Sequence, residues 1–380
     1  MCNRNAHRSG APHAKLMPWL PAHSSTVGIE RPSDVHHEER RPRDASGTPS
    51  CDFQPVGTLL VASAGGHLEE LWALRPRLQG ISEDVTWVTW ANEQTRSLLR
   101  DEEVVYVAPA QPRDVLAAAK NLALAARLLR ARTFDTAVST GSSLAVSFLP
   151  IARLRGTHCH YIESATRVGS PSVSAKLLER VPGINFYTQY RNWSQPRWLY
   201  RGSVFDPFTP GPSAERPIRR AVVTVGTAKG FGFRRLVEAV RRCLDDEVEV
   251  LWQTGSTDVS SLGISARKVI SSDDLFGAIE AADVVVAHAG AGSSLAALRA
   301  GKCPLLVPRR AAFGEHVDDH QVEIATELEG RELAIKREAH EISREDLALA
   351  AARSTVVRPE DCPFILAGAA SPAPGAIRRP

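Results

Sequence analysis

The chain has 380 residues, enough for two domains that each bury a hydrophobic core. Its 46 Lys and Arg residues nearly balance 43 Asp and Glu residues, and the net charge of +3 excludes a histone-like nucleic-acid binder. No apolar run reaches the roughly 18 residues that cross a membrane, and no apolar stretch follows the N-terminus. We therefore predict neither a membrane span nor a secretory signal.

Both ends of the chain are predicted to be disordered tails. Residues 1–56 are rich in proline, hold five of the twelve histidines and show no sustained hydrophobic period. A metal-binding histidine tail is the alternative for this segment. Residues 361–380 are predicted as the second tail, because Ala, Gly and Pro dominate its sequence from residue 368 onward.

Apolar, strand-like runs alternate with helical stretches from residue 57 to residue 205. The strands are predicted at 58–64, 85–90, 104–108, 136–140, 158–162 and 184–188, and the helices include 67–78 and 114–132. This alternation is typical of a parallel α/β sheet with helices on its faces.

A Pro- and Gly-rich linker at 206–217 precedes a second series of alternating elements at 218–360. Its strands are predicted at 221–225, 248–253, 268–271, 284–288 and 304–308, and its helices include 233–244 and 293–300. The chain is therefore predicted to form two Rossmann-like, doubly wound domains that face a cleft, where ligands bind at the carboxyl ends of the strands. Several enzyme and binding-protein families share this architecture, so it does not settle the function.

The first strand of the first domain leads into Gly65-Gly66-His67. Glycines at a strand-to-helix turn allow close backbone approach, and the free N–H groups of a helix start suit a pyrophosphate. His67 stands where a general base would face the cleft. The alternative is a tight turn that happens to begin a helix with histidine.

Small and polar residues also follow three strands of the second domain. The strongest of these turns runs from His288 to Ser294 and offers successive N–H groups and two serine hydroxyls to a diphosphate. Weaker signals are Gly226-Thr227 and the segment 253–256, while His320 and Gln321 follow the next strand. The alternative is a set of turns whose glycines serve packing alone.

Metal and redox signatures are missing from the sequence. None of the six cysteines forms a C-x-x-C pair, which leaves a zinc ribbon or a thioredoxin-type site without support and favours free thiols in a reducing cytoplasm. No D-x-D motif occupies a strand-to-helix loop. We therefore expect no cofactor and a reaction that needs no metal.

Taken together, these motifs resemble a glycosyltransferase family. Through Gly226-Thr227, 253–256, 288–293 and 319–321, the second half resembles the C-terminal domain of MurG, the peptidoglycan GlcNAc transferase. It also resembles the catalytic subunit of the eukaryotic two-subunit GlcNAc transferase acting on dolichol pyrophosphate. Through 65–69, 139–141 and 161–167, the first half resembles the membrane-recruiting partner subunit, so the chain looks like a natural fusion of the two.

The resemblance implies a GT-B fold and an inverting transfer from a UDP-sugar to a polyprenyl-diphosphate-linked glycan in cell-surface polysaccharide synthesis. The sugar implied is GlcNAc, glucuronic acid or a hexose, and Arg309 and Arg310 are candidates to pair with a glucuronate carboxylate. The enzyme is expected at the cytoplasmic membrane face as a peripheral protein, in contact with other polysaccharide-assembly enzymes and not with nucleic acid. A basic helix at 114–132 is the candidate membrane contact, although it also fits a helix packed on the sheet.

The resemblance also implies a set of site residues. The catalytic candidates are His67 and Glu163, with Glu69 and Glu70 as further candidate bases. The acceptor-binding candidates are Gly65, Gly66, Glu69, Gly141 and Ser142. The donor-binding candidates are Gly226, Thr227, Gln253, Gly255, Ser256, His288, Gly290, Ala291, Gly292, Ser293, Ser294, His320 and Gln321.

One position departs from the pattern. Relatives carry a Glu eight residues after the motif histidine, expected to bind the nucleotide ribose, and this chain has Ala296. Glu315, Asp318 and Asp319 are candidate substitutes. The alternatives to a transferase are a sugar-nucleotide epimerase of similar form and, because of Ala296, a non-catalytic sugar-nucleotide-binding scaffold.

Overall fold

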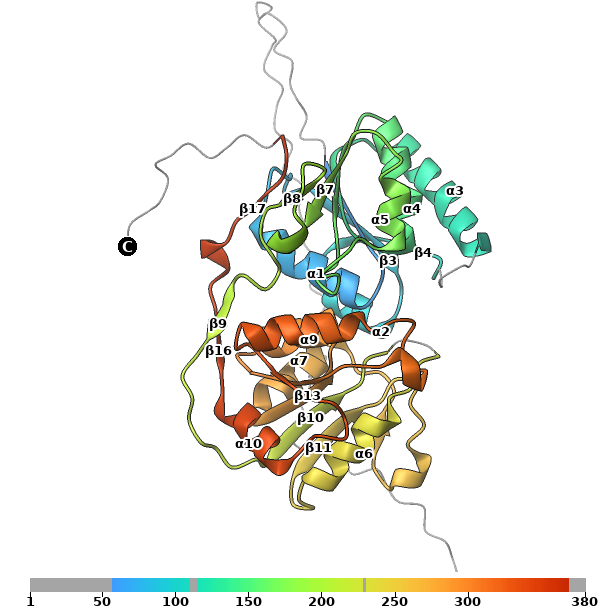
Figure 1. Ribbon diagram of the computed structural model, residues 1–380. Helices are drawn as coiled ribbons and strands as arrows, with labels where there is room; N and C mark the ends of the chain where they lie inside the picture. The colour runs from blue at the N-terminus through green and yellow to red at the C-terminus, as the bar shows by residue number, and fades with distance from the viewer. Residues whose placement is uncertain (1–56, 110–114, 228–229, 369–380) are drawn as a thin grey trace, which may run out of the picture.

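The computed structural model describes residues 57–109, 115–227 and 230–368, coloured from blue to red in Figure 1. The tail predicted at 1–56 lies outside these residues, as do residues 369–380 of the second predicted tail. None of the helices in the described part of the chain is long and apolar enough to cross a membrane.

The first domain is built on a seven-stranded parallel sheet in the order β4-β3-β1-β5-β6-β7-β8. The strands are β1 (Gly57–Ala62), β3 (Val85–Trp90), β4 (Glu103–Val107), β5 (Phe134–Gly141), β6 (His158–Ile162), β7 (Ile184–Thr188) and β8 (Trp198–Tyr200). The central strand β1 is buried along its whole length, because helices cover both faces of a parallel sheet.

Five helices follow these strands within the described residues. They are α1 (Gly66–Leu74), α2 (Glu93–Leu98), α3 (Val115–Ala131), α4 (Ser142–Leu154) and α5 (Val173–Leu178). Local sequence signals explain two of the helix starts. Asn92 forms a capping box with Thr95 at the start of α2, and the Ser172 hydroxyl accepts the N–H of Ala175 at the start of α5.

The second domain repeats the plan with a six-stranded parallel sheet in the order β12-β11-β10-β13-β14-β15. Its strands are β10 (Arg220–Thr224), β11 (Glu249–Gln253), β12 (Ala266–Arg267), β13 (Val284–His288), β14 (Leu305–Val307) and β15 (Ile335–Lys336). Its helices are α6 (Arg234–Cys243), α7 (Ser272–Ala281), α8 (Ala291–Arg299), α9 (His320–Gly330) and α10 (Arg344–Ala352).

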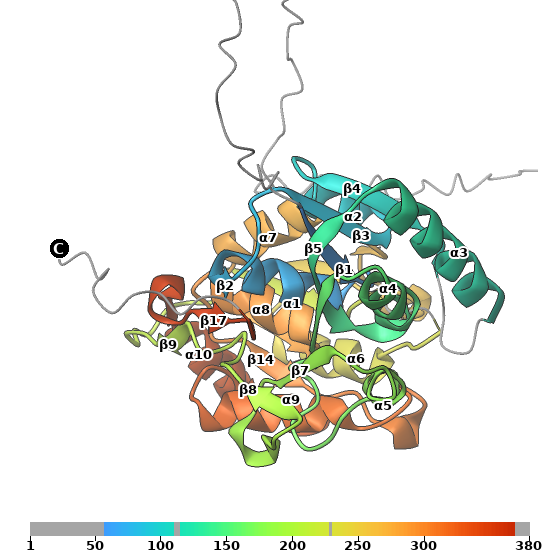
Figure 2. The same cartoon turned by 90° about the horizontal axis from the view of Figure 1, so that it is seen from above.

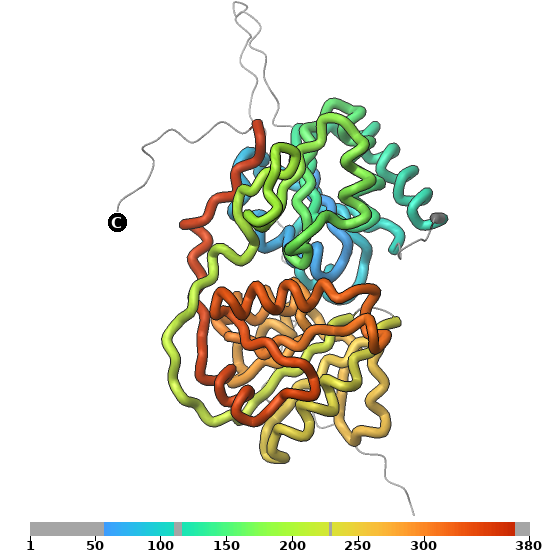
Figure 3. The backbone as a smooth tube through the Cα atoms, viewed as in Figure 1, coloured from blue at the N-terminus to red at the C-terminus, as the bar shows by residue number. Residues whose placement is uncertain are grey.

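The end of the described chain returns to the first domain beside the linker (Figure 3). In the linker, β9 (Phe208–Pro210) pairs antiparallel with β16 (Thr355–Val357), and farther on β17 (Phe364–Ile365) pairs with β2 (Leu78–Gln79). Phe364 is fully buried there and contacts Tyr187 with ring centroids 5.5 Å apart. The expectation of a disordered tail from residue 361 is therefore corrected for residues 361–368.

The two domains meet through helices that follow the central strands. Viewed from above, α1 lies beside α8, and α2 lies near α7 (Figure 2). One apolar cluster contains Leu68 and Leu71 from α1 together with Ala291 and Leu295 from α8. The starts of α1 and α8 are thereby held against each other.

The predicted α/β alternation is confirmed in both halves. Strands at 85–90, 158–162, 184–188 and 284–288 match β3, β6, β7 and β13 residue for residue. The strand predicted at 268–271 is wrong, because β12 ends at Arg267 and the chain then turns toward α7, whose N-cap is Ser271. An edge strand is paired on one side only, so apolar residues beyond the pairing register need not extend it.

Candidate active site between the two domains

Each sheet has one point where the chain reverses its direction of winding. In the first sheet this point lies between β1 and β5, and in the second between β10 and β13. The turns after adjacent central strands therefore come together at the carboxyl edge of each sheet, which is where α/β proteins bind ligands. This topology groups most of the predicted site residues into two sets, one per domain.

His67 forms the centre of the first set. Its Nδ1 lies 2.8 Å from the carbonyl oxygen of Thr140, at the end of β5, and the Thr140 hydroxyl donates to the carbonyl of His67 at 2.6 Å. A carbonyl only accepts, so Nδ1 carries the hydrogen and Nε2 keeps its lone pair. Burial lowers the pKa of His67, against the bond to Thr140, so the ring is neutral near pH 7.

The residues around this ring have unusual backbone angles. Gly141 has φ +120°, and a Cβ there would lie 3.1 Å from both the His67 Cε1 and the Tyr161 hydroxyl. Ser142, which begins α4, has φ +71° although it is not glycine. Strained backbone of this kind concentrates at functional sites. Gly65 has φ +93° and open space where a side chain would be.

Two predicted acidic residues are buried and fully engaged. Glu163, 1% exposed, accepts the N–H groups of Ser164 (3.1 Å) and Ser172 (2.7 Å) and the Tyr161 hydroxyl (3.2 Å). Glu70, completely buried, accepts from the Ser164 hydroxyl, from a backbone N–H and from a glutamine amide. Burial raises the pKa of both groups, that of Glu70 to about 8. These contacts fix the segment after β6.

Glu69 has a different environment. It lies half-buried in the seam between the domains, and a Cβ on Gly292 would be 3.2 Å from its Cγ and 3.4 Å from the Cα of Gly66. Burial raises the pKa of Glu69 to about 7, although the positive charge of Arg299 opposes the shift. The predicted acceptor and donor turns are thus in van der Waals range of each other.

His288 forms the centre of the second set. A Cβ on Gly226 would lie 2.6 Å from its Cε1, and one on Gly290 would overlap its Nε2, so both glycines are required by close packing on the ring. Its Nδ1 lies 3.3 Å from the Ser293 hydroxyl. Burial, reinforced by the charge of Arg309, lowers the pKa of His288 to about 3.

The remaining donor candidates surround this ring with polar groups. Gly255 lies against the carbonyl of Gly226, and the Ser256 hydroxyl donates to the Phe231 carbonyl at 3.0 Å. The side-chain amide oxygen of Gln253 accepts a hydrogen bond from the Thr224 hydroxyl at 2.9 Å. Thr227 is half-buried where this turn begins.

The start of α8 brings the other small residues to the same place. Ala291 is buried, Gly292 faces the first domain, and the Ser294 hydroxyl is buried without a hydrogen-bond partner among the described residues. The Gln253 amide nitrogen is another such atom. Ala296, two turns into the helix, is half-buried against an apolar cluster behind α8.

Arg309 is a site residue whose position differs from the expectation. Its side chain is 1% exposed and donates to the carbonyls of Val225, Phe231 and Glu315, whereas its Nε is buried without a hydrogen-bond partner among the described residues. The backbone N–H of Arg309 donates to the side-chain oxygen of Gln321 at 3.0 Å. Arg309 therefore ties the predicted donor turns together, while Arg310 pairs with Glu338.

The three acidic substitutes suggested for position 296 all have partners. Glu315 forms a two-pronged bond with Arg235, both distances being 2.8 Å. Asp318 contacts His320 and, across the cleft, Arg167 at 3.0 Å. Asp319 accepts the N–H of Ala311. Arg167 lies in the 161–167 motif, but sequence alone offered no sign that it reaches the other domain.

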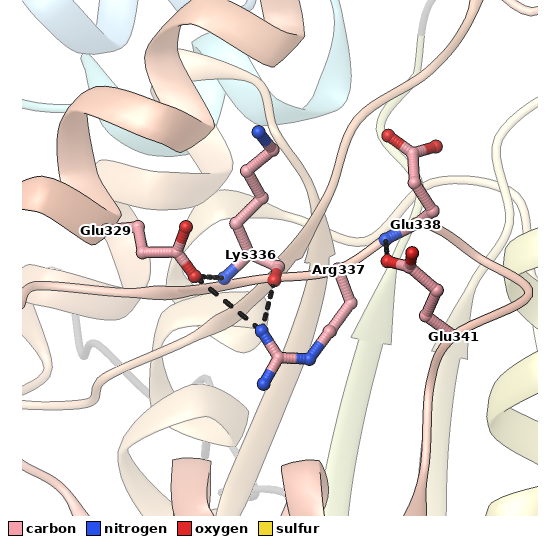
Figure 4. Close-up of a pocket in the computed structure, with 5 residues that line it drawn as sticks. All are labelled: Glu329, Lys336, Arg337, Glu338 and Glu341. Atoms are coloured by element: carbon pink, nitrogen blue, oxygen red, sulfur yellow. Dashed lines mark hydrogen bonds and ion pairs between the residues drawn. The ribbon is translucent and has the colours of Figure 1, made fainter.

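Two cavities differ in their relation to this cleft. One of about 560 Å³ lies between the domains, where Val168 and Gly169 face α9. The other, of about 520 Å³, lies at β15 on the edge of the second sheet, where Glu329 forms an ion pair with Arg337 (Figure 4). The first cavity begins one residue after Arg167, and neither cavity is lined by a predicted site residue.

Comparison with known proteins links the second domain to a glycosyltransferase family. Residues 220–354 match the model of the glycosyltransferase family 28 C-terminal domain. This range holds β10 to β15 and every predicted donor-binding residue. The match does not extend to the first domain.

Two curated relatives share parts of the chain. A UDP-N-acetylglucosamine--N-acetylmuramyl-(pentapeptide) pyrophosphoryl-undecaprenol N-acetylglucosamine transferase from Chlorobaculum tepidum is 27% identical over 220 residues, 52% of this chain and 58% of that protein. The UDP-N-acetylglucosamine transferase subunit ALG13 from Yarrowia lipolytica is 47% identical over 57 residues, 15% of this chain and 27% of that subunit. The chain thus spans about half and about a quarter of these relatives.

The architecture as a whole resembles a solved glycosyltransferase. The crystal structure of SnogD from Streptomyces nogalater aligns with a TM-score of 0.51 at 18% identity, covering 78% of this chain and 91% of that one. This likeness concerns the fold, and it confirms the predicted GT-B arrangement of two doubly wound α/β domains.

Proposed function

We propose that this protein is an inverting glycosyltransferase that moves a sugar from a UDP-sugar to a polyprenyl-diphosphate-linked acceptor. The observation that carries the proposal is the direct apposition of the two predicted turns, Gly66 in the first domain and Gly292 in the second. Two helix starts that face each other offer N–H groups to two phosphate-bearing substrates. A transferase needs this arrangement, because its substrates must meet between the sites.

The comparisons support the donor half of this proposal. The family match covers the second domain, and both curated relatives are named as N-acetylglucosamine transferases, one of which acts on a pyrophosphoryl-undecaprenol acceptor. UDP-GlcNAc is therefore the first donor to test, followed by UDP-glucuronic acid and UDP-hexoses. We further infer that the chain joins a donor-binding half and an acceptor-binding half in one polypeptide.

The donor's diphosphate is assigned to the start of α8. Backbone N–H groups there, together with the hydroxyls of Ser293 and Ser294, can stabilise the charge that develops on the leaving UDP. The buried, unpartnered polar atoms of Ser294 and Gln253 support a ligand at this place, since buried polar groups normally have partners. Because such donors can stabilise this charge on their own, we propose that the chemical step needs no metal.

His67 is the proposed general base. The acceptor hydroxyl attacks the anomeric carbon, the bond from that carbon to the β-phosphate oxygen breaks, and the hydroxyl proton passes to Nε2 of His67. Thr140 holds the tautomer that leaves this nitrogen free. Glu163 and Glu70 are proposed to position the loop after β6 rather than to transfer protons, because the carboxylate oxygens of both already accept hydrogen bonds inside the domain.

The acceptor's lipid is proposed to reach the protein from the side of α3, α4 and α5, at the cytoplasmic face of the membrane. Large apolar side chains are exposed on these helices, namely Leu116, Leu122, Leu154, Val173 and Leu177. The exposed basic residues Lys120, Arg127 and Arg130 lie on α3, which has no acidic residue among its described positions. Apolar and basic groups on one surface favour anionic lipid.

The membrane proposal is tested with vesicles of anionic and neutral lipid. Replacing Lys120, Arg127 and Arg130 with Glu is expected to abolish salt-sensitive cosedimentation with anionic vesicles. Exposed arginines of α6 serve as the matched control, through Arg241→Glu and Arg242→Glu. Equal binding by both variants would contradict the assignment.

The transferase proposal is tested by UDP release from purified protein. We expect release from one member of a UDP-sugar panel only when a polyprenyl-diphosphate glycan is present, with the sugar appearing on the lipid. Interconversion of UDP-sugars without acceptor would identify an epimerase. Tight UDP-sugar binding with no turnover would identify a non-catalytic scaffold.

A further inference from the structure

The loop before α9 and the start of that helix carry a cluster of two histidines and an aspartate. His316 and Asp318 lie in the loop, and His320 is the first residue of α9. One ring nitrogen of each histidine and a carboxylate oxygen of Asp318 all lie within 4.8 Å of one another. The two imidazole rings meet edge to face with centroids 4.6 Å apart.

One nitrogen of this group lacks a partner. Nδ1 of His316 is buried, lies 3.4 Å from Oδ1 of Asp318 and has no hydrogen bond among the described residues. The Asp318 side chain is 38% exposed, which leaves a path from the cleft.

The two carboxylate oxygens of Asp318 have different partners. Its Oδ1 faces both imidazoles, whereas its Oδ2 accepts from Arg167 of the first domain at 3.0 Å. In protein metal sites, a hydrogen-bond donor commonly contacts the carboxylate oxygen that does not coordinate the metal, and it thereby orients the carboxylate. Arg167 therefore holds the carboxylate in a ligating orientation without occupying the oxygen that would coordinate.

We propose that His316, Asp318 and His320 bind a divalent transition-metal ion such as Zn²⁺. Two imidazoles and one carboxylate suit Zn²⁺, and three protein ligands leave one coordination position open. The site shares His320 with the proposed donor set. The chemical step requires no metal, and the ion instead competes with the UDP-sugar for His320, a consequence that rests on the proposed function.

The test titrates untagged, full-length protein with Zn²⁺ by calorimetry and with Co²⁺ by visible absorption. The chain has twelve histidines, so the readout is the difference between wild type and variants. We expect His316→Ala and Asp318→Asn to lose one equivalent of bound metal, and Arg167→Ala to weaken that equivalent about 10- to 100-fold. His340→Ala removes an exposed histidine of the same domain and is expected to bind like wild type.

Equal stoichiometry and affinity in wild type and His316→Ala would overturn the site. The second readout is UDP binding, which Zn²⁺ is expected to weaken in wild type and to leave unchanged in His316→Ala. Equal weakening in both proteins, or none in either, would overturn the shared use of His320. Failure of metal-free protein to bind UDP would instead refute the proposed function, while the Zn²⁺ titration would still decide the metal site.

Discussion

Each domain places a histidine at its switch point, but the two histidines follow non-equivalent strands and lie in different environments. His67 follows the first central strand of its sheet and packs beneath Gly141, and His288 ends β13 and packs between Gly226 and Gly290. Nδ1 of His67 is held by a carbonyl, whereas Nδ1 of His288 faces a serine hydroxyl. Burial lowers the pKa of both rings, and Arg309 adds to the shift only at His288.

This difference indicates different tasks for similar turns. The carbonyl of Thr140 fixes the tautomer of His67 and leaves Nε2 able to accept a proton. His288 has a pKa of about 3 and glycines against its ring, so it stays neutral and fills space beside the proposed diphosphate site. The proposed function therefore assigns proton transfer to the switch point of one domain and anion binding to that of the other.

The largest expected effect comes from His67→Ala. Loss of a general base reduces kcat by about 10²-fold or more, equivalent to about 2.7 kcal/mol of transition-state stabilisation. UDP release with acceptor measures it, and UDP binding serves as the control for folding. Turnover near that of wild type with both substrates bound would contradict the role of His67.

The second effect concerns the glycine packed on His288. Gly226→Ala places a Cβ 2.6 Å from the ring at φ +76°, so we expect a loss of about 2 kcal/mol in stability together with weaker UDP binding. Gly263→Ala is the matched control, because φ is +65° there but space is open, and it is expected to cost about 1 kcal/mol. Urea unfolding measures both, and equal losses would show that the ring contact is unimportant.

The third prediction concerns the ionisation of Glu70, which is proposed to position a loop and not to transfer protons. Its pKa is raised from 4.5 to about 8 by burial, so the folded state binds a proton that the unfolded state releases. This contribution to stability is present below pH 4.5 and disappears as the pH rises toward 8. Glu70→Gln is expected to reduce the fall in unfolding free energy between pH 5 and pH 8. An unchanged slope would show that Glu70 ionises normally.

The smallest effect is expected at the contact between the domains. The side chains of Arg167 and Asp318 are 31% and 38% exposed, and water screens such pairs, so Arg167→Ala should cost less than about 1 kcal/mol of stability. Arg100→Ala breaks the more exposed interdomain pair with Asp273 and is the matched comparison. A loss of several kcal/mol of unfolding free energy in either variant would show that the ion pair contributes strongly to stability.

Much of the fold was predictable because buried parallel strands are continuous apolar runs between helices. β3, β6, β7 and β13 could be located to the residue for this reason. Short edge elements could not, since β2, β12 and β17 contain two residues each and owe their existence to a partner strand. The return of residues 361–368 to the first domain depends on a partner more than 280 positions away, as the Arg77–Cys362 bond shows.

The candidate site, like the fold, could be predicted from the sequence only in part. Local chemistry predicted the turns around His67 and His288, because glycine and small polar residues at a strand end are typical of turns that bind phosphate. Burial decided the environment of other residues. Glu163 and Arg309 looked exposed as charged residues near those turns, yet both are 1% exposed and form most of their hydrogen bonds with the backbone or nearby side chains.

Composition and periodicity were sufficient to establish two α/β domains, the strands that carry the turns and the residue types at each turn, because these properties depend on neighbours in the chain. The meeting of Gly66 with Gly292, the convergence of His316, Asp318 and His320, and the contact of Arg167 with Asp318 were decided by tertiary structure. Each depends on how two sheets dock and on which charged groups lose their water, and hydrophobic patterning along a chain does not encode either property.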